Sequence, residues 1–385
     1  MKIVHVTLRF DAPGGVETTV REIAHRLKAG GDDVEVFASD LYDESRWERR
    51  TDFRPEVDGV PVRRFRVVKR ILPSLTLPTM VGLTDALAEC GADIVHAHSH
   101  RYGHVLQAAA VARRCRIPLV VSTHYHPADR RETPWKRGLL RLEDVAFGMT
   151  AYRVARALVA ESELEARLVR EFAPSDRIRV VPPGVDLSDW SLAPGDLANG
   201  PSLPPEYFLY VGRIAPNKGL PYLVEALALL PPDARRPLVL MGTDWGERAA
   251  LEGLARRRGV AGSLLWLGHV PDRRAYQAVV ARARALVLPS EWEAFGLVLL
   301  DAMAAHTPVI ASAVGAVPEV LDGGRAGLLV PYGDPRALSE ALRNVLDDPE
   351  AARQRVSRAD EKVRSLDWSK STARLRELYR EVLGG

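Results

Sequence analysis

The chain has 385 residues, of which 46% are hydrophobic and 27% charged, and its formal net charge is +3. This is the composition of a globular protein that is long enough for two domains with complete cores. Acidic and basic residues are interspersed and no recognition motif accompanies them, so the basic pI of about 8.9 does not indicate a nucleic-acid partner.

The sequence contains little that indicates a membrane segment, a signal peptide or disulfide bonds. No apolar run reaches about 18 residues, and the N-terminal stretch MKIVHV is too short and too strand-like to be a signal peptide. We therefore expect a cytoplasmic protein. The two cysteines, Cys90 and Cys115, predict neither a disulfide framework nor a cysteine-rich metal site.

Short apolar runs alternate with helical patterns along the first half of the chain. The runs are KIVHVTL, DVEVFAS, DIVHAHS, PLVVSTH, ALVAES and IRVVPPG. The rhythm resumes after a Pro-, Gly- and Ser-rich stretch, with YFLYVGR, PLVLMGT, LLWLGHV, ALVLPS, PVIAS and GLLVP. Such alternation is typical of parallel sheets covered by helices.

The pattern predicts an α/β protein of two doubly wound domains in tandem. We place an N-terminal domain at residues 1–188, a linker at 189–205, a second domain at 206–365 and a closing helix at 366–385. Ligands of open parallel sheets bind beyond the carboxyl ends of the strands. Two facing domains are therefore expected to enclose a cleft lined by strand-to-helix loops.

The first such loop holds the glycine pair Gly14 and Gly15, directly before a helix whose apolar face includes Val20 and Ile23. Paired glycines let a ligand approach the backbone at a helix N-terminus, which suits phosphate. The dinucleotide spacing Gly-x-Gly-x-x-Gly is absent, and a simple tight turn explains the pair equally well.

Residues 61–80, PVRRFRVVKRILPSLTLPTM, place five cations before a group of apolar residues. The prolines favour an exposed loop, and basic residues beside apolar ones suit an anionic bilayer. Peripheral contact with the inner face of the membrane is one interpretation of this segment. The other is a strand with a solvated basic face, followed by a loop packed on the core. A second basic stretch, residues 129–144 with Trp135, could widen the surface.

Histidines cluster at two successive strand ends, as His96, His98 and His100 and then as His124 and His126. Zinc is the less favoured interpretation, because no nearby carboxylate or cysteine completes a tetrahedral set. Neutral histidines at a strand mouth can instead bond a sugar hydroxyl or a backbone carbonyl. We expect no metal and no other cofactor, and no Asp-x-Asp motif exists to anchor a divalent ion.

Two cations follow a strand in the second half, in VGRIAPNKGL. Arg213 and Lys218 precede a helix, where backbone N–H groups also point, within a frame of Gly212 and Gly219. An arginine fork and a mobile lysine suit a diphosphate, although a solvated surface pair is the alternative.

The stretch SEWEAFGLVLLDAMAAHTPVIAS contains two acids, Glu293 and Asp301. Its apolar spacing predicts a helix from about Leu297, followed by a strand from Pro308. Glu293 is then at the mouth of the helix, and Asp301 lies roughly 10 to 12 Å further along the axis. That distance is too long for a shared metal and fits two ends of one extended ligand.

Together, the motifs GGVE, HAHS, STH, VPPGVD, YVGRIAPNKG, LGHV and the Glu293 stretch closely resemble retaining glycosyltransferases of family 4. The resemblance covers nearly the whole chain. It implies the GT-B fold of two Rossmann-like domains facing a deep cleft, and transfer of a hexosyl group from a UDP- or GDP-sugar to an acceptor hydroxyl on a glycan, lipid or small molecule, usually without a metal.

The resemblance also implies roles for individual residues. Gly15, beside Gly14, would meet the diphosphate, and Arg213 and Lys218 would hold it. Glu293 would contact donor-sugar hydroxyls, with His124 near the sugar. The remaining donor contacts would come from Phe295, Gly296, Leu297 and, at the ribose, Asp301, while Ser162 would line the cleft.

Three residues depart from the family pattern. Asp301 replaces the second glutamate, Pro183 an asparagine, and His306 a glycine. Asp301 keeps an acceptor that is one methylene shorter, and the sequence does not decide what His306 does. An epimerase, a sugar phosphorylase or a non-catalytic sugar-nucleotide sensor remain the alternative functions, because the fold alone supports all of them.

Overall fold

The computed structural model describes residues 1–43, 47–72, 75–127, 133–190 and 201–384, and of residues 69–72 and 75–77 only the backbone. The chain forms two compact units. Unit 1 comprises Met1–Pro183 and Trp368–Gly385, and unit 2 comprises Gly184–Asp367. Residues 191–200 of the expected linker lie outside the described residues.

Unit 1 is built on a sheet with the strand order β12-β11-β10-β9-β1-β2-β6-β5, in which only β5 runs antiparallel to its neighbour. Its strands are β1 (Lys2–Thr7), β2 (Asp33–Ser39), β5 (Glu56–Val57), β6 (Val60–Phe65), β9 (Ile94–His98), β10 (Leu119–Ser122), β11 (Ala157–Ala160) and β12 (Ile178–Val180). Two antiparallel ribbons stand apart: β3 (Leu41–Asp43) with β4 (Glu48–Arg49), and β7 (Val67–Leu72) with β8 (Leu75–Met80).

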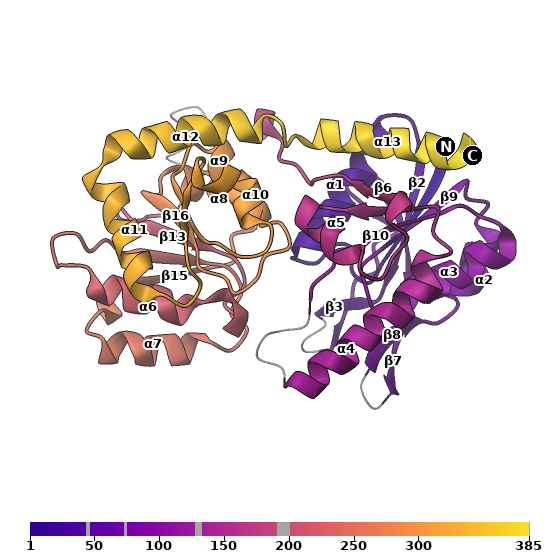
Figure 1. The fold of residues 1–385 in the computed structure, drawn as a ribbon, viewed down its shortest axis with the longest axis horizontal. Helices are drawn as coiled ribbons and strands as arrows, with labels where there is room; N and C mark the ends of the chain where they lie inside the picture. Colours follow the sequence, from indigo (N-terminus) through magenta and orange to yellow (C-terminus); the bar gives the residue numbers. More distant parts are fainter. Residues whose placement is uncertain (44–46, 73–74, 128–132, 191–200, 385) are drawn as a thin grey trace. The chain divides into compact units, whose positions relative to one another are not determined.

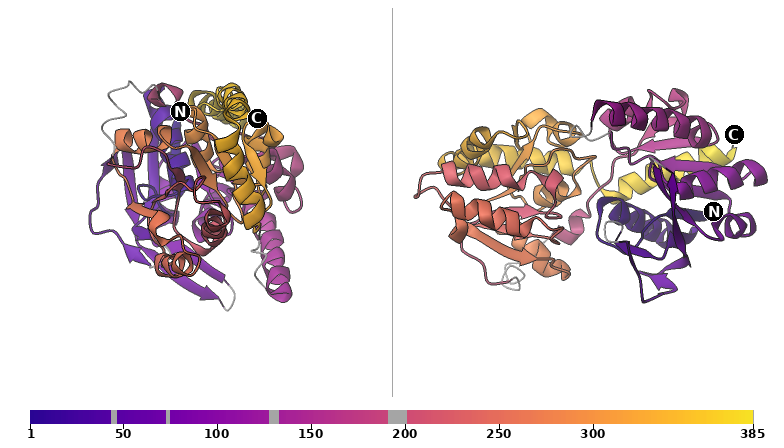
Figure 2. Two further views of the ribbon diagram at one scale, coloured as in Figure 1. Left: turned by 90° about the vertical axis from the view of Figure 1, so that its left-hand side faces the viewer. Right: turned by 90° about the horizontal axis from the view of Figure 1, so that it is seen from below.

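Helices cover both faces of this sheet, because its strands carry apolar residues on both sides. One face packs against α1 (Gly15–Ala29) and the C-terminal α13 (Trp368–Gly384). The other packs against α2 (Leu83–Glu89), α3 (Gly103–Cys115) and α5 (Glu163–Val169). α4 (Pro134–Phe147) continues into a single π-helical turn, η1 (Gly148–Tyr152). The yellow α13 lies within unit 1 although it ends the sequence, as Figure 1 and the right-hand view of Figure 2 show.

Unit 2 is an all-parallel sheet of order β15-β14-β13-β16-β17-β18 around one hydrophobic core. The strands are β13 (Phe208–Val211), β14 (Leu238–Met241), β15 (Leu264–Gly268), β16 (Ala285–Leu288), β17 (Val309–Ser312) and β18 (Leu328–Val330). The helices are α6 (Leu220–Leu229), α7 (Arg248–Arg257), α8 (Arg273–Ala281), α9 (Leu297–Ala304), α10 (Val317–Val320), α11 (Pro335–Asp347) and α12 (Pro349–Val363).

The expected doubly wound architecture is confirmed, and all twelve predicted apolar runs form strands. Two interpretations were open for residues 61–80, an exposed loop or a strand followed by a packed loop. The segment contributes to β6 and to the β7–β8 ribbon, apart from residues 73–74, which lie outside the description, so the exposed loop is wrong and the strand of the other interpretation is present. Pro78 is accommodated because a two-stranded ribbon leaves one edge of each strand unpaired. No helix in the described part of the chain is long and apolar enough to cross a membrane.

Candidate active site

Two loops of unit 2 meet at the carboxyl ends of β13 and β16. Gly219 has a φ of +65°, and a Cβ at this position would lie 1.9 Å from the carbonyl oxygen of Pro289. The backbone N–H of Glu291 also donates to the carbonyl of Asn217 at 3.0 Å. Only glycine permits this approach. The glycine following Lys218 therefore brings the cation-bearing loop against the loop that carries Glu293.

The result is an ion pair between two of the predicted site residues. Lys218 Nζ lies 2.6 Å from Glu293 Oε1, and each side chain is only 13% exposed. A charge-assisted bond in a partly dehydrated place is stronger than one at the open surface. The fold therefore brings the cationic loop and Glu293 together.

A third loop holds the backbone of Glu293 in place. Gly315, after β17, has a φ of +53°, and a Cβ there would lie 1.9 Å from the carbonyl oxygen of Glu293. The same oxygen accepts a bond of 3.1 Å from the N–H of Ala316. Because β13, β16 and β17 are adjacent, three successive strand ends build this one position.

Helix α9 begins directly after Glu293, as predicted. Gly296 caps it in the left-handed region, with a φ of +86°, and the Phe295 side chain is buried in the core. Leu297 is the first residue of the helix and is partly buried. Phe295 therefore offers a ligand its backbone, and the free N–H groups of the first turn carry the positive end of the helix dipole.

Arg213 does not join the Lys218–Glu293 pair. Its guanidinium lies over the ring of Trp245, 4.4 Å from the centroid, and its carbonyl accepts a 2.7 Å bond from the hydroxyl of Tyr210. Stacking orients the planar fork without neutralising it. Among the described residues no carboxylate pairs with Arg213, which leaves its donors available to an anion.

Asp301 projects from α9 into a separate cluster. Its Oδ2 accepts a bond of 2.7 Å from the hydroxyl of Tyr276, and Arg273 Nη1 lies 4.0 Å from its Oδ1. Burial, followed by the charge of Asp301, raises the pKa of Tyr276 well above its ordinary value. Tyr276 therefore stays protonated and donates, so that Asp301 is held in one orientation.

In unit 1 the glycine pair begins α1. Gly14 is extended and caps the helix, and a Cβ there would meet the Glu17 carboxylate at 2.0 Å. Glu17 in turn pairs with Arg9 at 2.6 Å. A Cβ on Gly15 would have nothing within 4 Å. Packing therefore explains glycine at position 14, whereas at position 15 the chain leaves open space at a helix N-terminus.

His124 lies at the carboxyl end of β10, in the left-handed region with a φ of +41°. Its Nδ1 is 3.1 Å from Glu161 Oε1, and its Nε2 is 3.4 Å from Nδ1 of His98. Burial lowers the pKa of His124, but the carboxylates of Glu161, Glu165 and Glu17 outweigh burial and raise the pKa overall.

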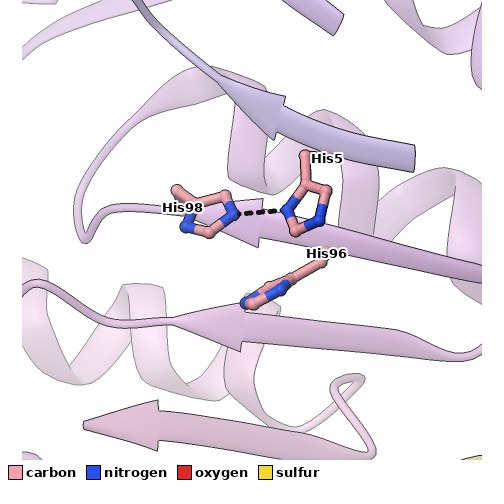
Figure 3. Close-up of side chains that lie close together, drawn as sticks. All are labelled: His5, His96 and His98. Atoms are coloured by element: carbon pink, nitrogen blue, oxygen red, sulfur yellow. Dashed lines mark hydrogen bonds between the residues drawn. The ribbon is translucent and has the colours of Figure 1, made fainter. Parts of the chain in front are cut away.

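The hydrogen-bonded chain continues inward from His98 to His5, whose Nδ1 is 3.0 Å from His98 Nε2 (Figure 3). His96 lies beside them and bonds Tyr379 at 2.6 Å and Ser122 at 2.9 Å. Burial lowers the pKa of His5 to about 3 and those of His96 and His98 well below the usual value.

His5, His96 and His98 have nitrogens close enough together to be considered as a metal set. However, the rings of His96 and His98 are tilted by 31° to one another, with their centroids 4.2 Å apart. Both nitrogens of His96 already have hydrogen-bond partners, in Tyr379 and Ser122, and Nε2 of His98 lies 3.0 Å from Nδ1 of His5. Hydrogen bonding accounts for this cluster.

Sequence reasoning missed Glu161 and Glu165, the acids that face His124. The available signal was the Ser-x-x-Glu pattern of Ser162 and Glu165, which is a capping box and predicts a helix N-terminus there. Ser162 Oγ accepts from the Glu165 N–H at 3.1 Å, so Ser162 is a buried helix cap. The carboxylate of Glu165 accepts from the backbone N–H groups of Tyr125 and Glu161, at 2.6 Å each. Gly315 and Tyr276 had no local signal, because their partners are distant in the sequence.

Unit 2 carries cations and a carboxylate at adjacent strand ends of an open parallel sheet, which is where such sheets bind phosphorylated ligands. Comparison with known proteins agrees. The family model described as "Glycosyltransferase Family 4" matches residues 13–189, and "Glycosyl transferases group 1" matches residues 198–362.

The chain is 32% identical to the D-inositol 3-phosphate glycosyltransferase of Kineococcus radiotolerans, over 96% of this chain and 91% of that protein. It is 31% identical to a glycogen synthase of Mycobacterium tuberculosis, over 74% of this chain and 68% of that protein. The chain therefore belongs to the family 4 glycosyltransferases, and it is a nucleotide-sugar-dependent glycosyltransferase.

Solved structures show the same fold. Sucrose-phosphate synthase from Thermosynechococcus elongatus superposes with a TM-score of 0.78 at 24% identity, covering 100% of this chain and 99% of that one. Anabaena HepE in complex with UDP gives a TM-score of 0.78 at 21% identity, covering 99% and 100%. The expected GT-B class is thus confirmed.

Proposed function

We propose that the chain transfers a hexosyl group from a UDP-sugar to an acceptor hydroxyl, with retention of anomeric configuration and without a metal. The observation that carries this proposal is the Lys218–Glu293 pair at the mouth of α9, with the guanidinium of Arg213 free of carboxylates in the same set of loops. A site with two cations and a helix N-terminus has the charge to hold a diphosphate by itself.

The pair also suggests how the donor is recognised. Lys218 and Glu293 neutralise each other in the structure. A diphosphate is a stronger partner for the ammonium, because it presents more negative charge and several acceptor oxygens. When Lys218 moves to the phosphate, Glu293 becomes free to accept hydrogen bonds from the sugar hydroxyls.

The other predicted residues complete the proposed site. The backbone from Phe295 to Leu297, through Gly296, lies along the sugar, and Asp301 accepts from the ribose hydroxyls. In unit 1, the open backbone at Gly15 approaches the diphosphate, and His124 lies near the sugar. Arg213 and Lys218 stabilise the negative charge that develops on the departing nucleoside diphosphate in the transition state.

UDP is preferred to GDP as the donor nucleotide. Support comes from solved neighbours whose titles name complexes with UDP and with UDP-glucose. For the acceptor, the named relatives are a glycogen synthase and inositol 3-phosphate glycosyltransferases, which suggests a polyhydroxylated acceptor.

Thermal-shift measurements with UDP, GDP and ADP in the presence of EDTA test the donor half of this proposal. UDP should raise the melting temperature most, because a ligand that binds only the folded chain stabilises it. Transfer is then measured with UDP-glucose and polyol or glycan acceptors, and the anomeric configuration of the product is read by NMR. Stabilisation by UDP without transfer or hydrolysis would favour a sensor, and activity restored only by added magnesium or manganese would contradict the metal-free mechanism.

A further inference from the structure

One side of unit 1 exposes an unusual amount of apolar surface. Trp135, Leu142, Val145 and Met149 are all exposed, Trp135 by 71% and Leu142 by 65%. They account for four of the nine large hydrophobic residues that are exposed in the described part of the chain. Their spacing of three, four and seven places them on one stripe of α4 and η1.

A groove lies at the η1 end of this stripe, between η1 and the last turns of α3. Its volume is about 920 Å³, and Met149 lines it together with apolar residues such as Ile117 and Leu106. Four arginines complete the lining: Arg113, Arg116, Arg153 and Arg156. Apolar and cationic surfaces are therefore continuous on this face.

The four arginines are not neutralised. All are exposed, and within the described residues no carboxylate lies within ion-pair distance of any of them. On α4 itself, Arg137 is likewise exposed and unpaired among the described residues. A groove with this much unbalanced positive charge attracts anions.

The groove lies at the opposite edge of the unit 1 sheet from Gly15 and His124. Pro118 directly precedes β10 and Arg156 directly precedes β11, so the groove lies at the amino ends of the strands. Gly15 and His124 lie at the carboxyl ends. Helix α4 connects the two edges, and Trp135 to Met149 spans roughly 20 Å along it. Figure 1 shows α4 running along the side of the unit.

We propose that the α4 stripe and the arginine groove together form a surface that docks on an anionic lipid bilayer. The apolar stripe enters the interfacial region, as amphipathic surface helices do, and the arginines bind lipid phosphates. A soluble phosphate would use the arginines but would leave the exposed tryptophan and leucine unexplained. The membrane accounts for both halves of the surface.

This proposal relocates the membrane contact suggested by residues 61–80. Arg64 is 6% exposed and pairs with Asp11 at 2.6 Å, and Arg63 lies over the rings of Phe37 and Phe65. Arg64 is therefore engaged inside unit 1, and Arg63, although exposed, is held over two rings. Of Lys69, Arg70 and the apolar residues that follow to Leu77, the side chains lie outside the described residues.

The test is sedimentation of the whole chain with vesicles of phosphatidylcholine, with or without about 30% phosphatidylglycerol, at low and high salt. The groove variant is Arg113→Ser, Arg153→Ser and Arg156→Ser. Its charge-matched control is Arg114→Ser, Arg256→Ser and Arg257→Ser, three exposed arginines that do not line the groove. A separate variant, Trp135→Ser with Leu142→Ser, removes the stripe.

We expect the wild type and the control to bind anionic vesicles at low salt, the groove variant to bind at least about tenfold more weakly, and the stripe variant to lose binding that survives high salt. UDP-induced stabilisation should be unchanged in all of them, which separates this test from that of the proposed function. Failure of the wild type to sediment, or equal binding by the groove variant and its control, overturns the proposal. So does a rise in melting temperature with glycerol phosphate that the groove variant loses, if vesicles are not bound, because the groove would then serve a soluble phosphate.

Discussion

The two units present different chemistry at the carboxyl ends of similar parallel sheets. In unit 2 the strand ends bring Lys218 together with Glu293, by means of glycines that allow the loops to touch. In unit 1 the strands carry a chain of buried imidazoles, from His5 through His98 to His124. The first edge is held by backbone contacts and an ion pair, and the second by hydrogen-bonded imidazoles, with a carboxylate, that of Glu161, facing His124.

Because of this difference, we expect the two edges to respond to different perturbations: unit 2 to the loss of single charges and unit 1 to acid. Ion pairs at a ligand site exchange partners when a charged ligand arrives, so unit 2 should be sensitive to the loss of single charges. Among the described residues the buried imidazoles of His5, His96, His98 and His104 are hydrogen-bonded to uncharged groups, which do not compensate protonation, so unit 1 should be sensitive to acid. The predictions below, from the largest expected effect to the smallest, test this contrast.

Acidification should destabilise unit 1 first. The described histidines whose pKa is lowered all lie there: His5 (to about 3), His104 (to about 4), His96, His98 and His100. Below pH of about 6.5 the unfolded chain takes up protons on these imidazoles while the folded unit does not. The free energy of unfolding then falls by roughly 1.4 kcal/mol per pH unit for each histidine, until the folded pKa is reached. His124, with its raised pKa, contributes in the opposite sense.

The total loss from pH 7.5 to 5.5 is on the order of 5 kcal/mol. Urea unfolding at several pH values, with pulse proteolysis and peptide mapping, assigns each transition to a unit. The His104→Gln variant should flatten the pH dependence of unit 1, with exposed His25→Gln as its control. Loss of unit 2 before unit 1 at low pH would contradict the prediction.

Replacing Glu293 by Gln should lower turnover by two orders of magnitude or more, roughly 3 kcal/mol of transition-state stabilisation, while the fold persists. The amide keeps the size of the side chain but loses the negative charge that accepts from Lys218 and from the proposed sugar hydroxyls. Steady-state kinetics with UDP-glucose measure the change, with Glu252→Gln on α7 as the control. Equal turnover in variant and wild type would remove Glu293 from the chemistry.

Lys218→Ala should weaken UDP binding by about 1.5 to 3 kcal/mol, as measured by calorimetry. The loss reflects one charge-assisted contact to the diphosphate, reduced by the contact that Lys218 gives up with Glu293. Arg256→Ala, an exposed cation of the same unit, should bind UDP as the wild type does. Unchanged affinity in Lys218→Ala would show that the diphosphate lies elsewhere.

Asp301→Ala should raise the donor KM by about fivefold to tenfold, near 1 kcal/mol, with a smaller change in kcat, if the ribose contact is made equally in ground and transition states. Tyr276→Phe removes the donor that orients Asp301 and should raise KM less. A fall in kcat that exceeds the rise in KM would place Asp301 in the transition state instead.

His306→Gly should stabilise unit 2 by about 0.5 to 1 kcal/mol. His306 is exposed and has a φ of +54°, a conformation that costs a residue with a Cβ more than it costs glycine. Urea denaturation measures the difference. Destabilisation of the variant would mean that the His306 imidazole makes a stabilising contact despite its exposure.

Much of the architecture could be predicted from local pattern. Strand runs such as FLYV in β13 and VIAS in β17 are apolar throughout because both faces are covered, and the glycines and prolines beside them mark the loops. The segment 41–80 was harder. Apolar and polar residues alternate only weakly in its short antiparallel ribbons, so the sequence of β7 and β8 did not show the two-residue period of a strand.

The sequence by itself determined the two parallel sheets, the loops at their strand ends and the residue types in those loops, because hydrophobic period and turn residues are local properties. Only the tertiary structure decided which of these side chains come into contact. Glu293 reaches Lys218 across 75 positions because Gly219 admits the Pro289 carbonyl, and His306 takes a left-handed backbone that only the surrounding fold imposes. Such contacts depend on how strands order themselves in a sheet, which is a property of the whole core and of no single segment.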